Sequence, residues 1–160
     1  MKKYFYTLAT VAALLAAAPV SAQTANQTVT VVVSDINSIS VSSGSVTLTV
    51  NSATAGSNPD DATDSSTSYS ITTNGSAKKI TAALGSAYAT GISLAINLTA
   101  PSGGTSAGST TLTTSAQEVV TGISNLAESG IGISYTASAT PSATSNGAGE
   151  AQTVTLTITS

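Results

Sequence analysis

The sequence predicts an all-β protein, an Ig-like or jelly-roll β-sandwich of about nine or ten short strands, after a cleaved N-terminal signal peptide. First, short runs of Val, Ile, Leu and Thr alternate with a period of two residues, as in Val46–Val50. Second, Gly, Pro, Asn and Ser cluster between these runs at the spacing typical of sandwiches and barrels. Third, no stretch after residue 22 has the length and composition of a helix.

The first 22 residues have the organisation of a secretory signal peptide. Met1–Lys3 are positively charged, residues 4–18 are almost all apolar or small, and residues 20–22 are small enough for signal cleavage. A membrane-spanning helix needs about 20 apolar residues, so the apolar run is short for an anchor. We therefore expect cleavage between Ala22 and Gln23, no later membrane span, and a secreted protein located outside the cell or on a bacterial cell surface.

After cleavage, we expect an N-terminal strand and hinge in residues 23–35 and a single sandwich domain in residues 36–160. Alternation defines the strands, because Thr, Val and Ile suit a half-buried pleated surface. The expected strands are Thr28–Val33, Ile36–Val41, Val46–Val50, Ser68–Thr73, Lys79–Leu84, Ile92–Thr99, a weaker Thr110–Thr113, Glu118–Ile123, Ile131–Ala139 and residues 153–159.

The first expected strand lies close to the new N-terminus and has Val29, Val31 and Val33 on one face. Ser34-Asp35 follows it as a possible hinge. Such a strand either pairs within its own domain or completes the sheet of a neighbouring subunit by strand addition. The residues of this candidate donor strand are Thr28, Val29, Thr30, Val31, Val32 and Val33.

Turn chemistry separates the later strands. Asn74-Gly75 favours a type I′ hairpin between the runs on either side of it, and Ser42–Gly44 has hairpin spacing as well. Asn51–Ser66 and Pro141–Glu150 are expected to be loops, and Ser124–Ser129 has the composition for a single helical turn.

The chemistry available to the mature chain is limited. It contains no His, Cys or Trp, which removes the usual general base, the thiol nucleophile and the soft metal ligands. Lys78 and Lys79 are its only basic side chains, and we interpret them as solvated residues that protect an edge strand. Without a basic surface, binding to a nucleic acid is not expected. We expect a protein that is not an enzyme.

One acidic cluster stands out in the longest loop, formed by Asn58, Asp60, Asp61 and Asp64. Closely spaced carboxylate and amide oxygens can bind Ca²⁺. The spacing is not that of an EF-hand loop, and a solvated acidic loop explains the same residues. No other cofactor is indicated.

The combination of a signal peptide, an early Thr/Val strand, a Ser/Thr/Gly-rich middle and the closing run of residues 149–159 resembles secreted bacterial surface-fibre subunits. The style is similar to that of spore-coat-U-like and chaperone–usher-type pilins and of camelysin/TasA-like matrix fibre proteins. This resemblance implies a sandwich that polymerises by donor-strand exchange and has no catalytic residues. Many usher-type pilins carry a disulfide, whereas this chain has no Cys.

Two functions remain open from the sequence. The first is a structural subunit of an extracellular filament, pilus or surface coat, whose main partners are copies of itself and whose other partners are surface or matrix components. The alternative is a monomeric exported binding module, such as an adhesin or a carbohydrate- or calcium-binding sandwich with its site in the loops. The assembly state of the mature protein separates them.

Overall fold

The computed structural model describes residues 22–160. The predicted signal peptide, apart from Ala22, lies outside the described residues. Residues Val33–Ser160 form a compact unit that holds every strand assigned in the described part of the chain, and residues 22–32 belong to a separate unit. The strands are β1 (Asn37–Val41), β2 (Ala62–Thr73), β3 (Lys78–Leu84), β4 (Ile92–Leu98), β5 (Thr105–Ser106), β6 (Thr110–Thr111), β7 (Gln117–Ile123), β8 (Leu126–Ala139) and β9 (Val154–Thr159).

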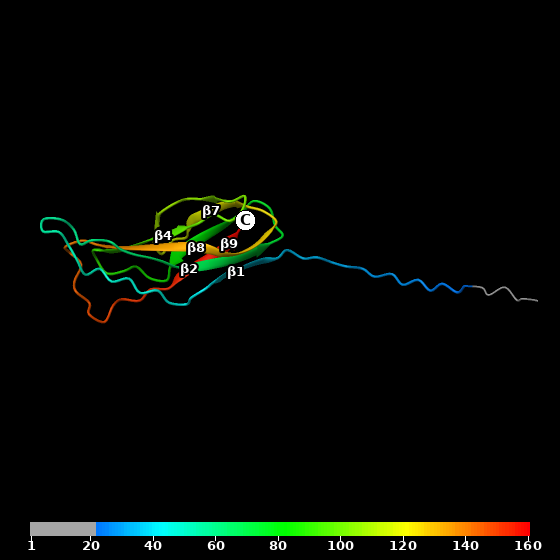
Figure 1. The fold of residues 1–160 in the computed structure, drawn as a ribbon, viewed down its shortest axis with the longest axis horizontal. Helices are drawn as coiled ribbons and strands as arrows, with labels where there is room; N and C mark the ends of the chain where they lie inside the picture. Colours follow the sequence, from blue (N-terminus) through cyan, green and yellow to red (C-terminus); the bar gives the residue numbers. More distant parts are fainter. Residues whose placement is uncertain (1–21) are drawn as a thin grey trace, which may run out of the picture. The chain divides into compact units, whose positions relative to one another are not determined.

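The strands form two antiparallel sheets packed as a sandwich, which confirms the predicted fold class (Figure 1). One sheet has five strands in the order β1-β2-β8-β4-β6, and the other has four in the order β5-β7-β3-β9. From β2 to β9, successive strands alternate between the two sheets, so every connection in this part of the chain crosses from one sheet to the other. Across residues 22–160 no helix is long and apolar enough to span a membrane.

The core lies between the sheets and contains one alternate set of residues from each inner strand. In β4, for example, Leu94, Ile96 and Leu98 are buried, while the residues between them are more exposed. The buried apolar side chains are Tyr69, Ile71, Ile80, Ala82, Leu84, Leu94, Ile96, Leu98, Leu112, Val119, Val120, Ile123, Ile131 and Ile133. Because most of these side chains are aliphatic, the core is stabilised by close packing of β-branched residues and leucines.

Tyr69 is the largest fully buried side chain of the core. Its hydroxyl donates a hydrogen bond of 2.7 Å to the main-chain oxygen of Thr99, so its polar atom is satisfied. Burial, together with the nearby carboxylate of Glu128, raises the pKa of Tyr69 to about 12. Burial alone raises the pKa of Tyr135 as well.

A bulge lets the two longest strands, β2 and β8, keep their apolar residues facing the core. Tyr69 pairs with Ile131 but Ile71 pairs with Glu128, so β8 carries one extra residue between these two rungs. Gly130 lies in that interval with φ of +71°, a left-handed conformation that glycine adopts without strain.

Most of the expected strands are present, with changes at their ends. β1, β3, β4, β7 and β9 lie within about one residue of the prediction, while β2 begins earlier, inside the expected loop Asn51–Ser66, and β8 begins at Leu126. The short strand β5 was not expected. The predicted helical turn at Ser124–Ser129 is wrong, because Asn125 has φ of +45° and β8 starts directly after it.

Val46–Val50 is not assigned as a strand, although its side chains alternate as expected. Val46, Leu48 and Val50 are half-buried and the two threonines are exposed. The predicted hairpin around Ser42–Gly44 does not form, because β1 pairs with β2 instead. Alternation therefore located an extended segment correctly but gave no information about its partner.

The predicted hairpin at Asn74-Gly75 is also wrong. β2 belongs to the five-stranded sheet and β3 to the four-stranded sheet, so the connection crosses the sandwich instead of joining neighbouring strands. Stacked sheets lie about 10 Å apart and paired strands about 5 Å apart, so a two-residue hairpin turn does not fit here. Within this connection Ala77, with φ of +52°, takes the left-handed conformation.

The interpretation of Lys78 and Lys79 as solvated residues that protect an edge strand from unwanted pairing is wrong as well. β3 lies between β7 and β9, so it is an inner strand of its sheet. Lys79 forms an ion pair of 2.6 Å with Glu118 on β7, and Lys78 is largely covered. Both lysines have partners, which a solvated edge lysine would not need.

Candidate assembly site

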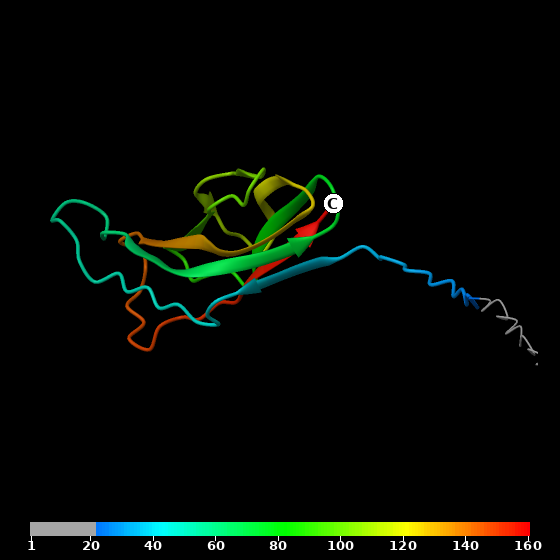
Figure 2. The ribbon, with the colours of Figure 1, turned by 45° about the vertical axis from the view of Figure 1, so that its right-hand side comes forward.

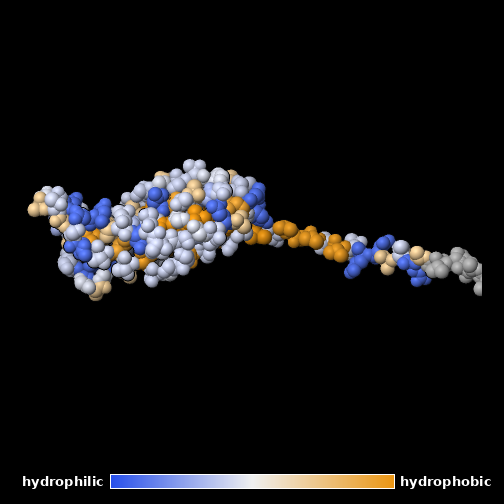
Figure 3. Space-filling view, in the orientation of Figure 1, coloured by the Kyte–Doolittle hydropathy of each residue, from blue (hydrophilic) through white to orange (hydrophobic). Residues whose placement is uncertain are grey.

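Residues 28–33 are extended and unpaired in this structure. They carry no strand assignment, and Val29, Val31, Val32 and Val33 are 74%, 80%, 83% and 72% exposed. Figure 3 shows a continuous run of hydrophobic residues in this part of the chain. The segment is alternating and largely apolar, and it carries no strand assignment in this structure.

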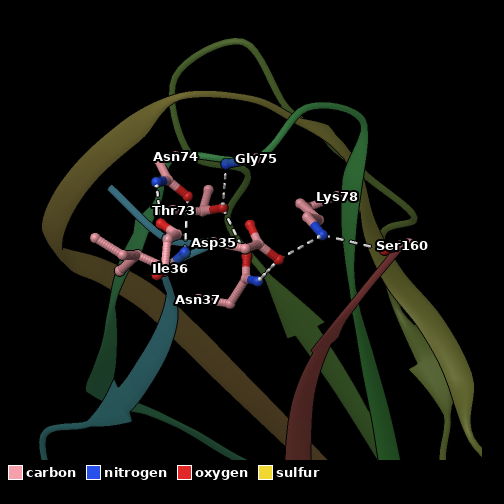
Figure 4. A network of polar contacts seen from close by, with 9 residues as sticks. Asp35, Ile36, Asn37, Thr73, Asn74, Gly75, Lys78 and Ser160 are labelled. Atoms are coloured by element: carbon pink, nitrogen blue, oxygen red, sulfur yellow. Dashed lines mark hydrogen bonds and ion pairs between the residues drawn. The ribbon is translucent and has the colours of Figure 1, made fainter. Parts of the chain in front are cut away.

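A polar network holds the chain where it joins the compact unit, at residues 34–37 (Figure 4). We call it the exit network; its members are Ser34, Asp35, Ile36, Asn37, Thr73, Asn74, Gly75, Lys78 and Ser160. It connects the start of β1 with the β2–β3 connection and with the residue after β9.

The side chain of Asn74 forms hydrogen bonds with the main chain on both sides of Asp35. Its side-chain oxygen accepts a 2.7 Å hydrogen bond from the amide of Ile36, and its side-chain nitrogen donates a 2.8 Å bond to the carbonyl oxygen of Ser34. The amide of Asn74 also donates to the carbonyl oxygen of Ile36 at 3.2 Å. The sequence predicts a hinge at Ser34-Asp35. In the structure, Ser34 is bonded to Asn74, and Asp35 is bonded to Asn37 and paired with Lys78.

Lys78 joins the two ends of the compact unit. Its ammonium nitrogen lies 3.5 Å from a carboxylate oxygen of Asp35 and donates a 3.1 Å hydrogen bond to the hydroxyl of Ser160. The Lys78 side chain is 12% exposed and that of Asp35 is 61% exposed, so part of the pair is shielded from water. The exit of the N-terminal segment and the end of β9 therefore lie at the same end of the sandwich.

β9 is an edge strand with an incompletely covered apolar face. Among the described residues it pairs with β3 only. Its Val154, Leu156 and Ile158 are half-buried, although their partners on the same rungs of β3 are buried. Residues on one rung of a sheet share a face, so the difference in burial arises from the open side of β9.

β1 is the matching edge of the five-stranded sheet. Its strand partner among the described residues is β2, and it approaches β9 across the sandwich, as Figure 2 also shows. Val41 is 48% exposed although Tyr69, its partner on β2, is fully buried. The two edges together form one open side of the sandwich, which the sequence could not reveal because it depends on strand order.

The acidic residues predicted to share one loop are divided, because Asn58, Asp60 and Asp61 precede β2 and Asp64 lies in it. A carboxylate oxygen of Asp60 accepts a 2.8 Å bond from the hydroxyl of Ser52, and Asp64 accepts bonds from the amide and hydroxyl of Ser66. Within residues 22–160, no group of three or more His, Cys, Asp or Glu side chains is arranged to hold a metal ion. The calcium hypothesis for Asn58, Asp60, Asp61 and Asp64 therefore gains no support from the geometry.

A hollow with a volume of about 350 Å³ lies beside the exit network. It is open and mostly apolar, with Ile36, Leu126 and Ala127 in its wall. Its lining includes no charged side chain, so it offers no group for acid–base chemistry.

Comparisons of this chain with protein-family models, with curated proteins and with solved structures found no match.

Proposed function

We propose that this protein is the structural subunit of an extracellular filament, pilus or surface coat that polymerises by β-strand addition. In this proposal, residues 28–33 of one subunit complete a sheet of the next subunit. The observation that carries it is the exposure of four valines in an alternating, unpaired segment joined to a sandwich with one open side.

The physical reason is that the single chain leaves two complementary groups of atoms unsatisfied. Three valines on one face of the segment are exposed to water, and burial of each would contribute about 1.5 kcal/mol or more. An edge strand in turn presents a row of free amide and carbonyl groups that templates pairing. Pairing between subunits would satisfy both, and the main-chain bonds would supply affinity.

Head-to-tail contacts between identical subunits generate an open filament when the rotation between them does not close. The partners in this proposal are copies of the same chain. Export through the predicted signal peptide would bring the subunits outside the cell or to its surface, where surface or matrix components would be further partners. In a chain without Cys, pairing between subunits would provide the robustness that many exported domains obtain from disulfides.

The test compares two deletions in the full-length chain. One removes residues 28–33, and the matched control removes the polar residues Gln23–Gln27 just before them. We expect filaments in negative-stain microscopy and SDS-resistant ladders for the parent and the control, and neither for the first variant. Circular dichroism should show a folded sandwich in every case, because the strands all lie after residue 33.

Two results would contradict the proposal. If the variant without residues 28–33 still forms filaments, this segment does not join the subunits. If the parent stays a monomer at high concentration and the deletion unfolds it, the segment is an intramolecular strand, and a monomeric binding module becomes the better description.

A further inference from the structure

We infer that the acceptor for residues 28–33 is the open edge of β9 in the neighbouring subunit, and that the two strands pair antiparallel with Val31 opposite Leu156. This inference rests on the proposed strand addition and specifies its partner surface. The occupant is therefore a second copy of this chain.

The first argument is the burial deficit of β9. Val154, Leu156 and Ile158 remain half-buried, while Ile80 and Ala82 on the same rungs are fully buried and Leu84 is 6% exposed. A strand added on the free side of β9 would cover the open flank of these three side chains.

The second argument is the match between the two strands. Directly opposed residues of an antiparallel pair lie on the same face. With Val31 opposite Leu156, Val29 lies opposite Ile158 and Val33 opposite Val154, which places all three inward valines beside apolar partners. Thr30 then lies opposite Thr157 on the outer face, and each strand has six residues.

The edge strands β5 and β6 have two residues each, and β1, the edge strand on the same side of the sandwich as β9, fits less well than β9. β1 has five residues, and its inward set is Asn37, Ile39 and Val41. The Asn37 side chain is already bonded, because its oxygen accepts from Thr73 and its nitrogen donates to Asp35. A valine strand placed against β1 would therefore face a bonded amide at one of three inward positions.

The third argument concerns direction. The N-terminal segment joins the compact unit beside Ser160, because Lys78 contacts both Asp35 and Ser160. In a fibre whose subunits repeat one orientation, the segment leaves one subunit at this end and enters the next at the opposite end. Val33 of the segment then lies near the start of the neighbour's β9, and Thr28 of the segment lies near the end of that strand. The two strands therefore run antiparallel.

A segment that folded back onto its own β9 would run the other way. Val33 would then lie close to Thr159, at the end of its own β9, and the two strands would be parallel. Val32 would approach Ile158 in that arrangement, whereas it lies opposite Thr155 in the arrangement between subunits. Position 32 therefore distinguishes the two.

Engineered cysteine pairs test the inference, because the chain has no cysteine of its own. The full-length chain carries Val32→Cys with Thr155→Cys, and the matched pair for the other edge carries Val32→Cys with Ser40→Cys. All three positions are exposed, so the substitutions should leave the fold intact. Each single variant serves as a control for chance disulfides.

We expect the pair at residues 32 and 155 to give a ladder of disulfide-linked dimers, trimers and longer species on non-reducing SDS gels, which collapses on reduction. The pair at residues 32 and 40 should give at most a tenth of that product. A ladder confined to the pair at residues 32 and 40 would overturn the assignment to β9, as would filaments in which neither pair cross-links.

A disulfide found only within monomers would overturn pairing between subunits at this edge. Electron microscopy of the same samples distinguishes a failure of the acceptor assignment from a failure of the proposed function. Filaments without the expected cross-link refute the acceptor alone, while a parent chain that forms no filaments refutes the proposed function and the acceptor with it.

Discussion

Neighbouring valines of the N-terminal segment should differ in assembly although they are alike in the single subunit. Val31 is 80% exposed and Val32 is 83% exposed, so replacing either by Thr should change the free energy of unfolding by less than about 0.5 kcal/mol. In the proposed pairing, however, Val31 faces the core of the neighbour and Val32 faces solvent. We expect Val31→Thr to weaken assembly and Val32→Thr to leave it nearly unchanged.

The size of the effect follows from the atoms exchanged. Val31→Thr replaces a buried methyl group, whose burial contributes about 0.8 kcal/mol, with a hydroxyl. An unpaired buried hydroxyl costs about 1–3 kcal/mol. A total of about 2 kcal/mol corresponds to roughly a 30-fold higher critical concentration for assembly. Thr keeps the β-branched shape, so the strand propensity of the segment is preserved.

The assay measures the critical concentration of each variant by sedimentation of assembled protein, with thermal unfolding of the soluble fraction as the control for folding. Equal effects of the two substitutions would refute the reasoning, because no face of the segment would then be special. A stronger effect of Val32→Thr would mean that the register is shifted by one residue, which turns the opposite face inward.

Three further predictions concern the sandwich itself. Tyr69→Phe should lower the free energy of unfolding in urea by about 1 kcal/mol at pH 7. The parent should also lose stability between pH 10 and about 12, because the Tyr69 hydroxyl has a pKa of 10 in the unfolded chain and about 12 in the folded one. If the free energy of unfolding depends on pH in the same way for the parent and the Tyr69→Phe variant, this prediction is wrong. Gly91→Ala should lower the free energy of unfolding by about 2 kcal/mol more than Gly103→Ala, measured by the same urea titration. Both glycines have positive φ, but a new Cβ at residue 91 would lie 2.6 Å from a backbone nitrogen, whereas one at residue 103 would meet no atom within 4 Å. Equal losses of stability would count against the described packing. Asn74→Ala should lower stability by about 1–2 kcal/mol and Asn74→Asp by less, because Asp keeps the acceptor and loses the donor; a harmless Asn74→Ala would show that the exit network does not hold the chain.

The sequence predicted most strands because alternation is a local property of the chain. The run of residues 153–159 is an example, since β9 lies within it and its apolar side chains face the core. Pairing is not local, and so the sequence could not show that Val46–Val50 lacks a strand partner or that β9 lies at an edge. The same limit explains Asn74-Gly75, where a good hairpin dipeptide lies in a connection between two sheets.

The candidate site could be predicted only in part. The apolar segment at residues 28–33 was evident from its composition and its position near the expected cleavage site. The exit network was not, because Lys78 acquires its roles through Asp35 and Ser160, which are distant from it in sequence. The local signals at its members, a hinge predicted at Ser34-Asp35 and a turn predicted at Asn74, gave no indication that these residues contact one another.

The exit network also bears on mechanical strength. In a fibre of these subunits, tension would reach each sandwich through residue 34 and pass by way of Asn74 and Lys78 into both sheets. The direction of pull would run along β1, so the ladder between β1 and β2 would be loaded in shear, with its hydrogen bonds sharing the force. A fibre built in this way would resist stretching with all the hydrogen bonds of this ladder at once. The force needed to rupture a single subunit would also depend on the side chains of Asn74, Asp35 and Lys78.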